Sequence, residues 1–148
     1  MNKMKKEDSV GFLLRRASVA NYFHFRNLFS KANSVVTPEQ WMVLVNLWIK
    51  DGLSQTELAK QSQKERTSLI RVLNNMERNN LIVRVSDKTD KRNKLIYLTN
   101  FAKSIEEESY TLAKQNNRDA VKGINKDELE IFKSVINKIY HNLKETKQ

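Results

Sequence analysis

Residues 53–99 read LSQTELAKQSQKERTSLIRVLNNMERNNLIVRVSDKTDKRNKLIYLT, and this stretch decides the fold. It predicts, in order, a short helix, a turn, a second helix, and two strands joined by a basic turn. The short helix begins with a capping box, in which the Ser54 hydroxyl accepts from the Glu57 amide and the Glu57 carboxylate reaches back to the Ser54 amide. Leu58 and Ala59 give this helix its buried side.

The second helix is predicted from an apolar stripe with spacings of i, i+3, i+4 and i+7. The stripe consists of Leu69, Val72, Leu73 and Met76. The opposite face has no carboxylate and consists of Thr67, Arg71, Asn74, Asn75 and Arg78, with Ser68 at its edge. Hydroxyl, amide and guanidinium groups read base edges and hold phosphates. A solvated helix face explains the polarity but not the missing acids, so the face is a candidate nucleic-acid surface.

The turn between the two helices is expected at residues 62–64. Ser62 and Glu65 also match a capping box, but a helix that began at Ser62 would leave no room for the turn of a helix-turn-helix. Asn79 and Asn80 are expected to end the second helix, because Asn readily takes the left-handed conformation past a helix end.

Two strands are predicted at residues 82–85 and 95–98, which are runs of β-branched, aliphatic and aromatic residues. Between them, residues 86–94 read SDKTDKRNK, with four basic and two acidic residues. A hairpin with a basic tip beside a helix-turn-helix is a winged helix. The sequence therefore predicts a mainly α fold with a small β-hairpin wing.

This stretch resembles the MarR family of bacterial transcription regulators. The strongest similarity is DKRNK at residues 90–94, followed by LIYLT at residues 95–99, which is similar to the family's wing pattern of Asp-x-Arg and an apolar strand ending in Leu-Thr. Residues 69–77 and 81–84 are similar to the family's recognition helix and strand entry. In length and helix order the resemblance covers roughly the whole chain, whereas its specific motifs cover residues 53–99.

The resemblance implies how these elements would meet DNA. Thr67, Ser68 and Arg71 would lie in the major groove, Arg92 would enter the minor groove, and Asp90 would hold Arg92 in place. A guanidinium bonds bidentately to guanine, so Arg71 is the first choice for a base contact. The expected DNA-binding residues are Lys64, Arg66, Thr67, Ser68, Arg71, Asn75, Lys88, Asp90, Lys91, Arg92 and Lys94. The four lysines among them are expected to contact phosphates.

The sequence departs from the family pattern at four positions. Asn80 and Ala102 stand where the family usually or commonly has Gly, and Ser62 and Lys64 stand at positions that are often apolar. Asn at position 80 can take the conformation that Gly would take, so the expected fold is unchanged.

The net charge of +10 is concentrated in two regions of the 148 residues. Residues 1–36 hold seven basic and two acidic residues, residues 64–94 hold nine and four, and the remainder is neutral. A cationic recognition region favours nucleic acid as the partner. An anionic membrane surface is the competing partner, but it requires a continuous basic amphipathic helix, which residues 64–94 are not.

Several kinds of protein are excluded by what the sequence lacks. It has no Cys, which removes disulfides, thiol redox sensors and Cys-ligated zinc. The two histidines, His24 and His141, are far apart, so His24 is read as a core or interface residue and no metal or cofactor is expected. With no Gly-rich phosphate loop or catalytic constellation, an enzyme is not expected. No apolar run of about 20 residues or clear signal peptide is present, so we expect no membrane partner and a cytoplasmic location.

The remaining chain predicts further helices. One runs over residues 9–29, and one begins at Thr37 with Pro38 at its first position and is ended by Gly52. A long helix is expected from Thr99 to about residue 122. These helices suggest three parts of one compact domain: residues 1–36, 37–99 and 100–148, in which the central part binds DNA and the outer parts dimerise.

The last helix, starting at Asn125 with Glu128 three residues on, carries a heptad-like apolar seam. The terminal helices together have more apolar surface than a domain of this size needs, so we expect a homodimer. The expected dimerisation residues are Leu13, Phe23, Leu129, Phe132, Ile136, Ile139 and Leu143.

The function expected from these features is that of a homodimeric repressor or regulator of a near-palindromic DNA operator. The family resemblance implies a small-molecule effector. Candidate residues for its pocket are Phe12, Tyr22, Phe23, Trp41 and Trp48. The alternative role of each of these residues is plain core packing. Two other functions remain open: a module that binds RNA or protein, and an architectural protein that binds DNA without sequence preference.

Overall fold

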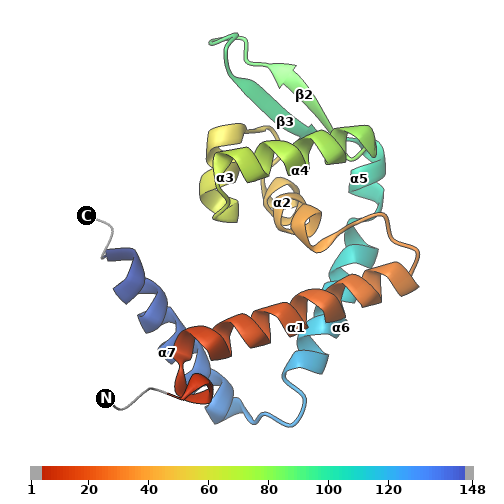
Figure 1. Cartoon of the computed structure of the whole chain (residues 1–148). Coiled ribbons are helices and arrows are strands. Elements are labelled where there is room, and N and C mark those ends of the chain that lie inside the picture. The colour runs from red at the N-terminus through yellow and green to blue at the C-terminus, as the bar shows by residue number, and fades with distance from the viewer. Residues whose placement is uncertain (1–4, 146–148) are drawn as a thin grey trace. The chain divides into compact units, whose positions relative to one another are not determined.

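The computed structural model describes residues 5–145, and Figure 1 shows the arrangement of their helices and strands. The helices are η1 (Lys6–Asp8), α1 (Val10–Lys31), α2 (Pro38–Ile49), α3 (Gln55–Ser62), α4 (Arg66–Arg78), α5 (Asn100–Ser104), α6 (Glu106–Ala120) and α7 (Lys126–Glu145). The strands are β1 (Leu53–Ser54), β2 (Ile82–Ser86) and β3 (Lys94–Leu98). The mainly α fold with a small β-hairpin wing is thus confirmed.

Two compact units divide the chain inside α6, one of residues 1–116 and one of residues 117–148, and each is described by itself. The first unit contains the winged helix. The second contains the end of α6 and all of α7. The three parts expected from the sequence, with boundaries at residues 36 and 99, stay a prediction.

Local capping sets the starts of α2 and α3. In α3 the Ser54 Oγ accepts from the Glu57 amide at 3.2 Å, and the Glu57 carboxylate accepts from the Ser54 amide at 2.8 Å. Thr37 and Gln40 form the same reciprocal pair at the start of α2, with Pro38 at its first position. The rejected capping box at Ser62 is indeed absent, since Ser62 lies inside α3 and its hydroxyl donates to the Leu58 carbonyl at 2.5 Å.

The core of the first unit forms around the predicted stripe of α4. Each of its four side chains is at most 7% exposed. They belong to one cluster with buried residues of α2, α3 and the sheet, among them Leu44, Leu47, Leu58 and Ile96. A neighbouring aromatic group joins α1, α2 and α6 through ring contacts among Phe25, Phe29, Trp41, Trp48 and Tyr110.

The sheet has a third strand that the sequence did not reveal. Its order is β1-β3-β2, and both pairings are antiparallel. The central strand β3 pairs Ile96 with Leu53 on one side and with Arg84 on the other. β1 has only two residues, one of which is the cap of α3, so its pattern is too short to predict a strand.

The expected role of Gly52 was wrong in detail. α2 ends at Ile49, and Gly52 lies beyond it with φ +75°, where its amide donates to the Ile96 carbonyl at 3.0 Å. Gly52 therefore forms the turn into β1. A Cβ at this position would lie 2.7 Å from a ring carbon of Tyr97, so a side chain here would force the ring to shift and would strain the left-handed backbone.

The single long helix expected after Thr99 was also wrong, although Thr99 does cap the first segment through the Ala102 amide at 3.0 Å. Ile105 interrupts the helix with ψ +4°, and the second segment ends at Ala120. The Ser104 hydroxyl donates to the Phe101 carbonyl at 2.7 Å and so competes with the backbone for that acceptor.

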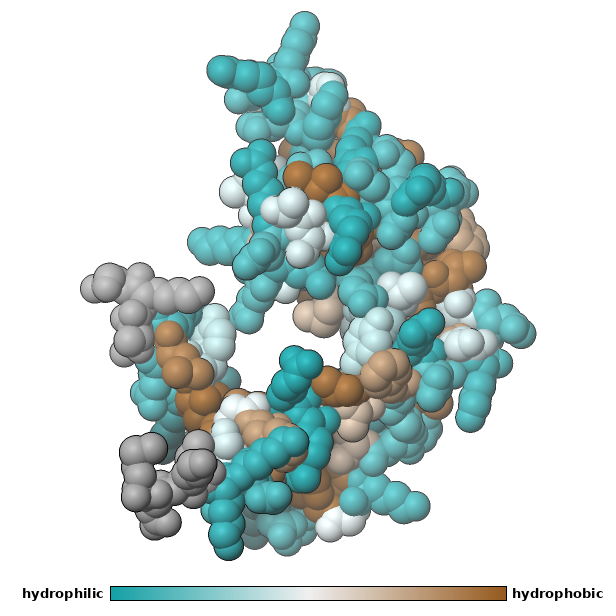
Figure 2. All heavy atoms as spheres, viewed as in Figure 1, coloured by the Kyte–Doolittle hydropathy of each residue, from teal (hydrophilic) through white to brown (hydrophobic). Residues whose placement is uncertain are grey.

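In the second unit Gly123, with φ +80°, precedes α7 as expected. Asn125 and Glu128 form the predicted reciprocal capping pair, with both distances at 2.9 Å. No residue of α7 whose side chain is described is buried, and Phe132 and Leu143 are 55% and 66% exposed. Figure 2 shows a row of hydrophobic residues along this helix.

The two left-handed glycines give a matched test of the turn at Gly52. Gly123→Ala should lower the unfolding free energy by about 1–2 kcal/mol, which is the cost of placing a residue with a Cβ in the left-handed conformation. No further cost is expected, because nothing lies within 4 Å of the added Cβ. Gly52→Ala should cost more, because its Cβ also meets the Tyr97 ring. Urea unfolding measures both, and the added substitution Tyr97→Ala should recover part of the excess. Equal costs for the two alanine variants would contradict the close contact.

Candidate nucleic-acid interface

The outward face of α4 carries the residues that the sequence selected. All side chains from Arg66 to Ser68 are exposed, as are Arg71, Asn74, Asn75 and Arg78. Figure 2 shows mainly hydrophilic residues over α4 and the wing in this view. The burial of the apolar stripe on the opposite side is what turns this face outward.

The turn before α4 leaves the start of that helix open. Gln63 takes the left-handed conformation with φ +52°, and the Lys64 amide donates to the Ala59 carbonyl at 3.1 Å. Glu65 precedes the helix, but its side chain makes no capping hydrogen bond. The exposed first-turn residues Arg66, Thr67 and Ser68 therefore follow an N-cap residue whose side chain does not cap the helix amides.

Hydrogen bonds from two aspartates shape the loop between β2 and β3. The Asp87 carboxylate accepts from the Thr89 amide at 2.9 Å and from the Thr89 hydroxyl at 2.8 Å. These two bonds hold the pKa of Asp87 below its usual value, and the bond from the Thr89 amide has the larger effect. Asp87 and Asp90 thus act as turn formers in a basic loop.

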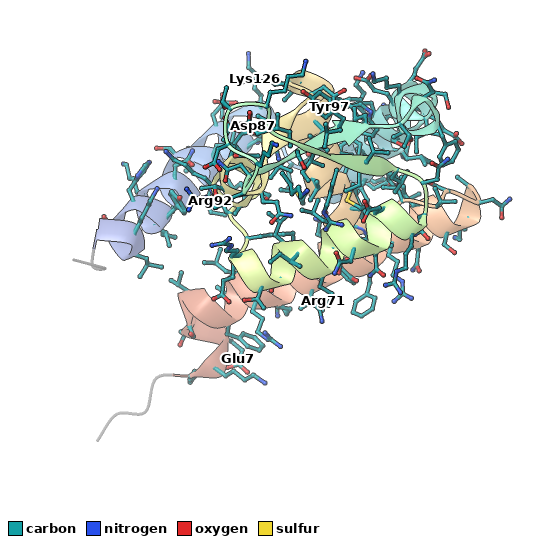
Figure 3. All side chains as sticks on the ribbon, turned by 90° about the horizontal axis from the view of Figure 1, so that it is seen from above. Glu7, Arg71, Asp87, Arg92, Tyr97 and Lys126 are labelled. Carbon is teal, nitrogen blue, oxygen red and sulfur yellow. The ribbon has the colours of Figure 1, made fainter. Side chains whose placement is uncertain are left out.

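Arg92 stands at the tip of the wing with a side chain that is 94% exposed (Figure 3). The Asp90 carboxylate accepts from the backbone amide of Arg92 at 3.0 Å and lies 3.5 Å from the Arg92 Nε. This is the arrangement in which Asp90 holds Arg92. Lys88, Lys91 and Lys94 are exposed beside it, and the Lys94 ammonium donates to the Ser86 hydroxyl at 2.7 Å.

Arg84 links the wing to α4 and was not among the expected DNA-binding residues. Its Nη1 lies 2.5 Å from a carboxylate oxygen of Glu77, and its Nη2 donates to the Asn74 amide oxygen at 2.7 Å. The one carboxylate within α4 is thereby paired. An arginine amid the β-branched residues of β2 is the sequence signal that would have identified it.

Two of the expected residues have different surroundings from the rest. The Asn75 amide oxygen accepts from Arg78 on the next turn of α4, so Asn75 is already engaged. Lys64 is half-buried and lines a cleft of about 500 Å³ together with residues of α1, α2 and α6. The structure therefore brings the other expected residues to α4 and the wing but places Lys64 at this cleft.

The cleft contains a hydrogen-bonded pair, in which the Tyr22 hydroxyl donates to the Glu39 carboxylate at 2.9 Å. This bond, together with burial, raises the pKa of Tyr22. Partial burial raises the pKa of Glu39, but hydrogen bonds from its backbone amide and Tyr22 outweigh that effect and lower it. The remaining lining residues are Ser18, Asn21, Phe25, Pro38, Trp41, Met42, Ala113 and Asn116.

Of the five aromatic residues proposed for a pocket, Tyr22 and Trp41 line this cleft. Trp48 instead packs against Trp41 and donates to the Ala102 carbonyl at 3.1 Å, while Phe12 lies under Lys6 and Arg16. His24 is exposed on α1, and its Nδ1 lies 2.9 Å from the Asn116 amide oxygen. His24 is therefore not a core residue, whereas its expected alternative place at an interface stays a prediction.

Within residues 5–145, no cluster of three or more His, Cys, Asp or Glu has the arrangement of a metal site. Over the same residues, no helix combines the length and the apolar character needed to cross a membrane.

Comparison with known proteins supports the fold of the chain and the resemblance of residues 36–94 to a known family. Residues 36–94 match the sequence model of the MarR family. A transcriptional regulatory protein described for the hcr operon of Thauera aromatica is 33% identical over 90 residues, which are 61% of this chain and 54% of that protein. The chain thus spans about half the length of this relative.

Solved structures extend the likeness to nearly the whole chain. BpsR of Bordetella bronchiseptica, whose DNA binding is regulated by 6-hydroxynicotinic acid, superimposes with a TM-score of 0.85 at 23% identity, over 94% of this chain and 98% of that one. A mutant of MarR from E. coli in complex with operator DNA gives a TM-score of 0.84 at 19% identity, over 94% and 99%. Residues 36–94 thus match the MarR family, and the chain has the fold of these solved structures.

Proposed function

We propose that this protein is a sequence-specific regulator of transcription that binds double-stranded DNA as a homodimer, and that it acts as a ligand-responsive repressor. The observation that carries the proposal is the exposed, acid-poor face of α4 beside a wing tipped by Arg92. The DNA complex of the E. coli relative, which has the same fold, supports it. A protein with this task would work in the cytoplasm, where bacterial operators lie.

In the proposed complex, α4 enters a major groove and the wing enters the adjacent minor groove. Arg66, Thr67 and Ser68 lie at the end of α4 where recognition helices contact base edges, and Arg71 follows one turn later. Lys88, Lys91 and Lys94 are placed to contact phosphates. A basic surface gives affinity for any DNA, whereas the exposed hydroxyls, amides and Arg71 give the choice of sequence.

The proposed dimer rests on apolar surface that the single chain leaves uncovered. On α1, Leu13 and Phe23 are 40% and 51% exposed, and the row on α7 is at least partly exposed throughout. A homodimer has twofold symmetry, so the operator should be a near-palindrome. Its half-sites should lie about one DNA turn apart, roughly 34–36 Å.

The proposed effector site is the cleft lined by Tyr22, Glu39, Trp41 and Lys64. It has aromatic walls and a few polar groups, which is the usual composition of a small-molecule site. Lys64 belongs to the turn between α3 and α4, so a ligand in the cleft would contact the segment that leads into the recognition helix. The regulation of BpsR by a small aromatic acid supports this part of the proposal.

The first experiment selects genomic fragments with the purified protein and then maps the protected bases at fixed salt. A protected near-palindrome supports the proposal. Binding that is uniform over all sequences and disappears with salt would favour an architectural protein, and a preference for RNA would favour an RNA-binding module.

Arg71→Ala should lower affinity for the selected operator by about 1–3 kcal/mol more than for random DNA, because a bidentate base contact discriminates by that amount. Fluorescence anisotropy on both duplexes measures the difference. Arg71→Lys is the matched control, since it keeps the charge but loses the fork, and it should recover random-DNA binding more than operator binding. Equal losses on both duplexes would assign Arg71 to phosphate.

Arg92→Ala should weaken binding to operator and random DNA alike and should reduce the salt dependence by about one unit of slope, because one phosphate-neutralising cation is lost. Titrations at several salt concentrations give the slope. Arg92→Lys should keep that slope. An Arg92→Ala protein with unchanged affinity would remove the wing from the proposed interface.

Phe132→Glu should turn the dimer into a monomer, because it puts a charge in the centre of the apolar row on α7. Sedimentation equilibrium measures the mass. Ser134→Glu introduces the same charge at an exposed position outside the row and should leave the dimer intact. A Phe132→Glu protein that remained a dimer would show that α7 does not form the interface.

A further inference from the structure

Arg84 occupies a position where its charge is costly. Side chains of β2 alternate between the two faces of the sheet: Ile82 is buried, whereas Val83 and Val85 are about half exposed. Arg84 lies on the same face as Ile82, and its side chain is only 17% exposed. Across the ladder it pairs with the fully buried Ile96. An apolar side chain would suit this site, because its cross-strand neighbour Ile96 is apolar and the Glu77 carboxylate is exposed enough for water to solvate it without Arg84.

The guanidinium is also incompletely satisfied. Its Nε is buried and makes no hydrogen bond to any of the described residues. Native structures pair nearly all buried polar groups, and an exception calls for an explanation. Stability alone therefore does not account for an arginine at position 84.

The other two nitrogens of Arg84 make a contact that joins two parts of the interface. Nη1 binds the Glu77 carboxylate at 2.5 Å, and Nη2 binds the Asn74 amide oxygen at 2.7 Å. Glu77 and Asn74 lie one turn apart on the recognition helix, whereas Arg84 lies on the wing. The contact fixes the distance between the two elements that must enter neighbouring grooves.

The same contact changes the charge that α4 presents. Glu77 is the one acidic residue within α4, and its side chain is 45% exposed. An unpaired carboxylate at the edge of the DNA-facing surface would repel phosphates. Pairing with Arg84 cancels that charge, and it also directs the Asn74 oxygen toward the wing, so that the amide NH₂ is the group left for DNA.

We propose that Arg84 is a positioning residue for DNA recognition, which fixes the wing to the recognition helix through Glu77 and Asn74 and neutralises the Glu77 carboxylate. This proposal rests on the proposed function. It differs from a phosphate contact, because Arg84 acts through other residues and does not touch DNA.

The test compares stability with binding in Arg84→Met, which keeps the length of the side chain and removes its charge. The melting temperature should stay within about 3 °C of wild type, since Glu77 and Asn74 are both exposed and water can solvate them when Arg84 is removed. Affinity for the selected operator should fall roughly tenfold, as expected for a coupling of this kind, with the salt slope unchanged. A purely structural role would lower melting temperature and affinity together.

Glu77→Gln supplies the second readout. Alone it should bind DNA at least as tightly as wild type, because it keeps an acceptor for Arg84 and removes a negative charge. Combined with Arg84→Met it should recover part of the lost affinity. Lys103→Met, which removes the same charge from the Lys103–Asp51 ion pair outside α4 and β2, is the control and should lose much less affinity.

An Arg84→Met protein that bound the operator like wild type would overturn the proposal. So would a loss of affinity with a salt slope about one unit shallower and no recovery by Glu77→Gln, which would make Arg84 a direct phosphate contact. Wild-type protein with no selective DNA binding would refute the proposed function itself, a result distinct from both.

Discussion

The burial of one apolar stripe on α4 is the constraint on which the first unit depends. Leu69, Leu73 and Met76 are completely buried and Val72 nearly so. Each such side chain stabilises the fold by about 1.5–3 kcal/mol, whereas a helix cap contributes about 1 kcal/mol. The stripe therefore determines the orientation of α4 about its helix axis. In this orientation the polar residues on the opposite side of α4 lie at the surface. Fold and interface are two faces of the same helix.

Much of the first unit could be predicted from residues close together in the sequence. The capping boxes at Ser54 and Thr37 need only a hydroxyl and a partner three residues later, and the left-handed end at Asn80 needs only a suitable residue. The periodicity of α4 is equally local. These features were found because their physical causes lie within one turn of helix.

The features that were missed depend on partners far away in the chain. β1 exists because β3 pairs with it, and Gly52 is needed there because the Tyr97 ring lies against it. The location of Lys64 at a cleft follows from the packing of α1, α2 and α6 around the turn. Arg84 could be noticed in the sequence, but its link to Glu77 becomes visible only when β2 lies beside α4.

The open start of α4 has an energetic consequence for the free protein. The Glu65 side chain forms no cap, so the first amides of α4 lack the acceptor that an N-cap side chain would supply. A phosphate carries oxygens and negative charge, both of which a helix start favours. DNA bound in the proposed way would therefore act as the missing N-cap. Part of the free energy of the phosphate contact would then be spent on ordering the first helical turn, which would exchange its amide hydrogens readily in the free protein and slowly in the complex.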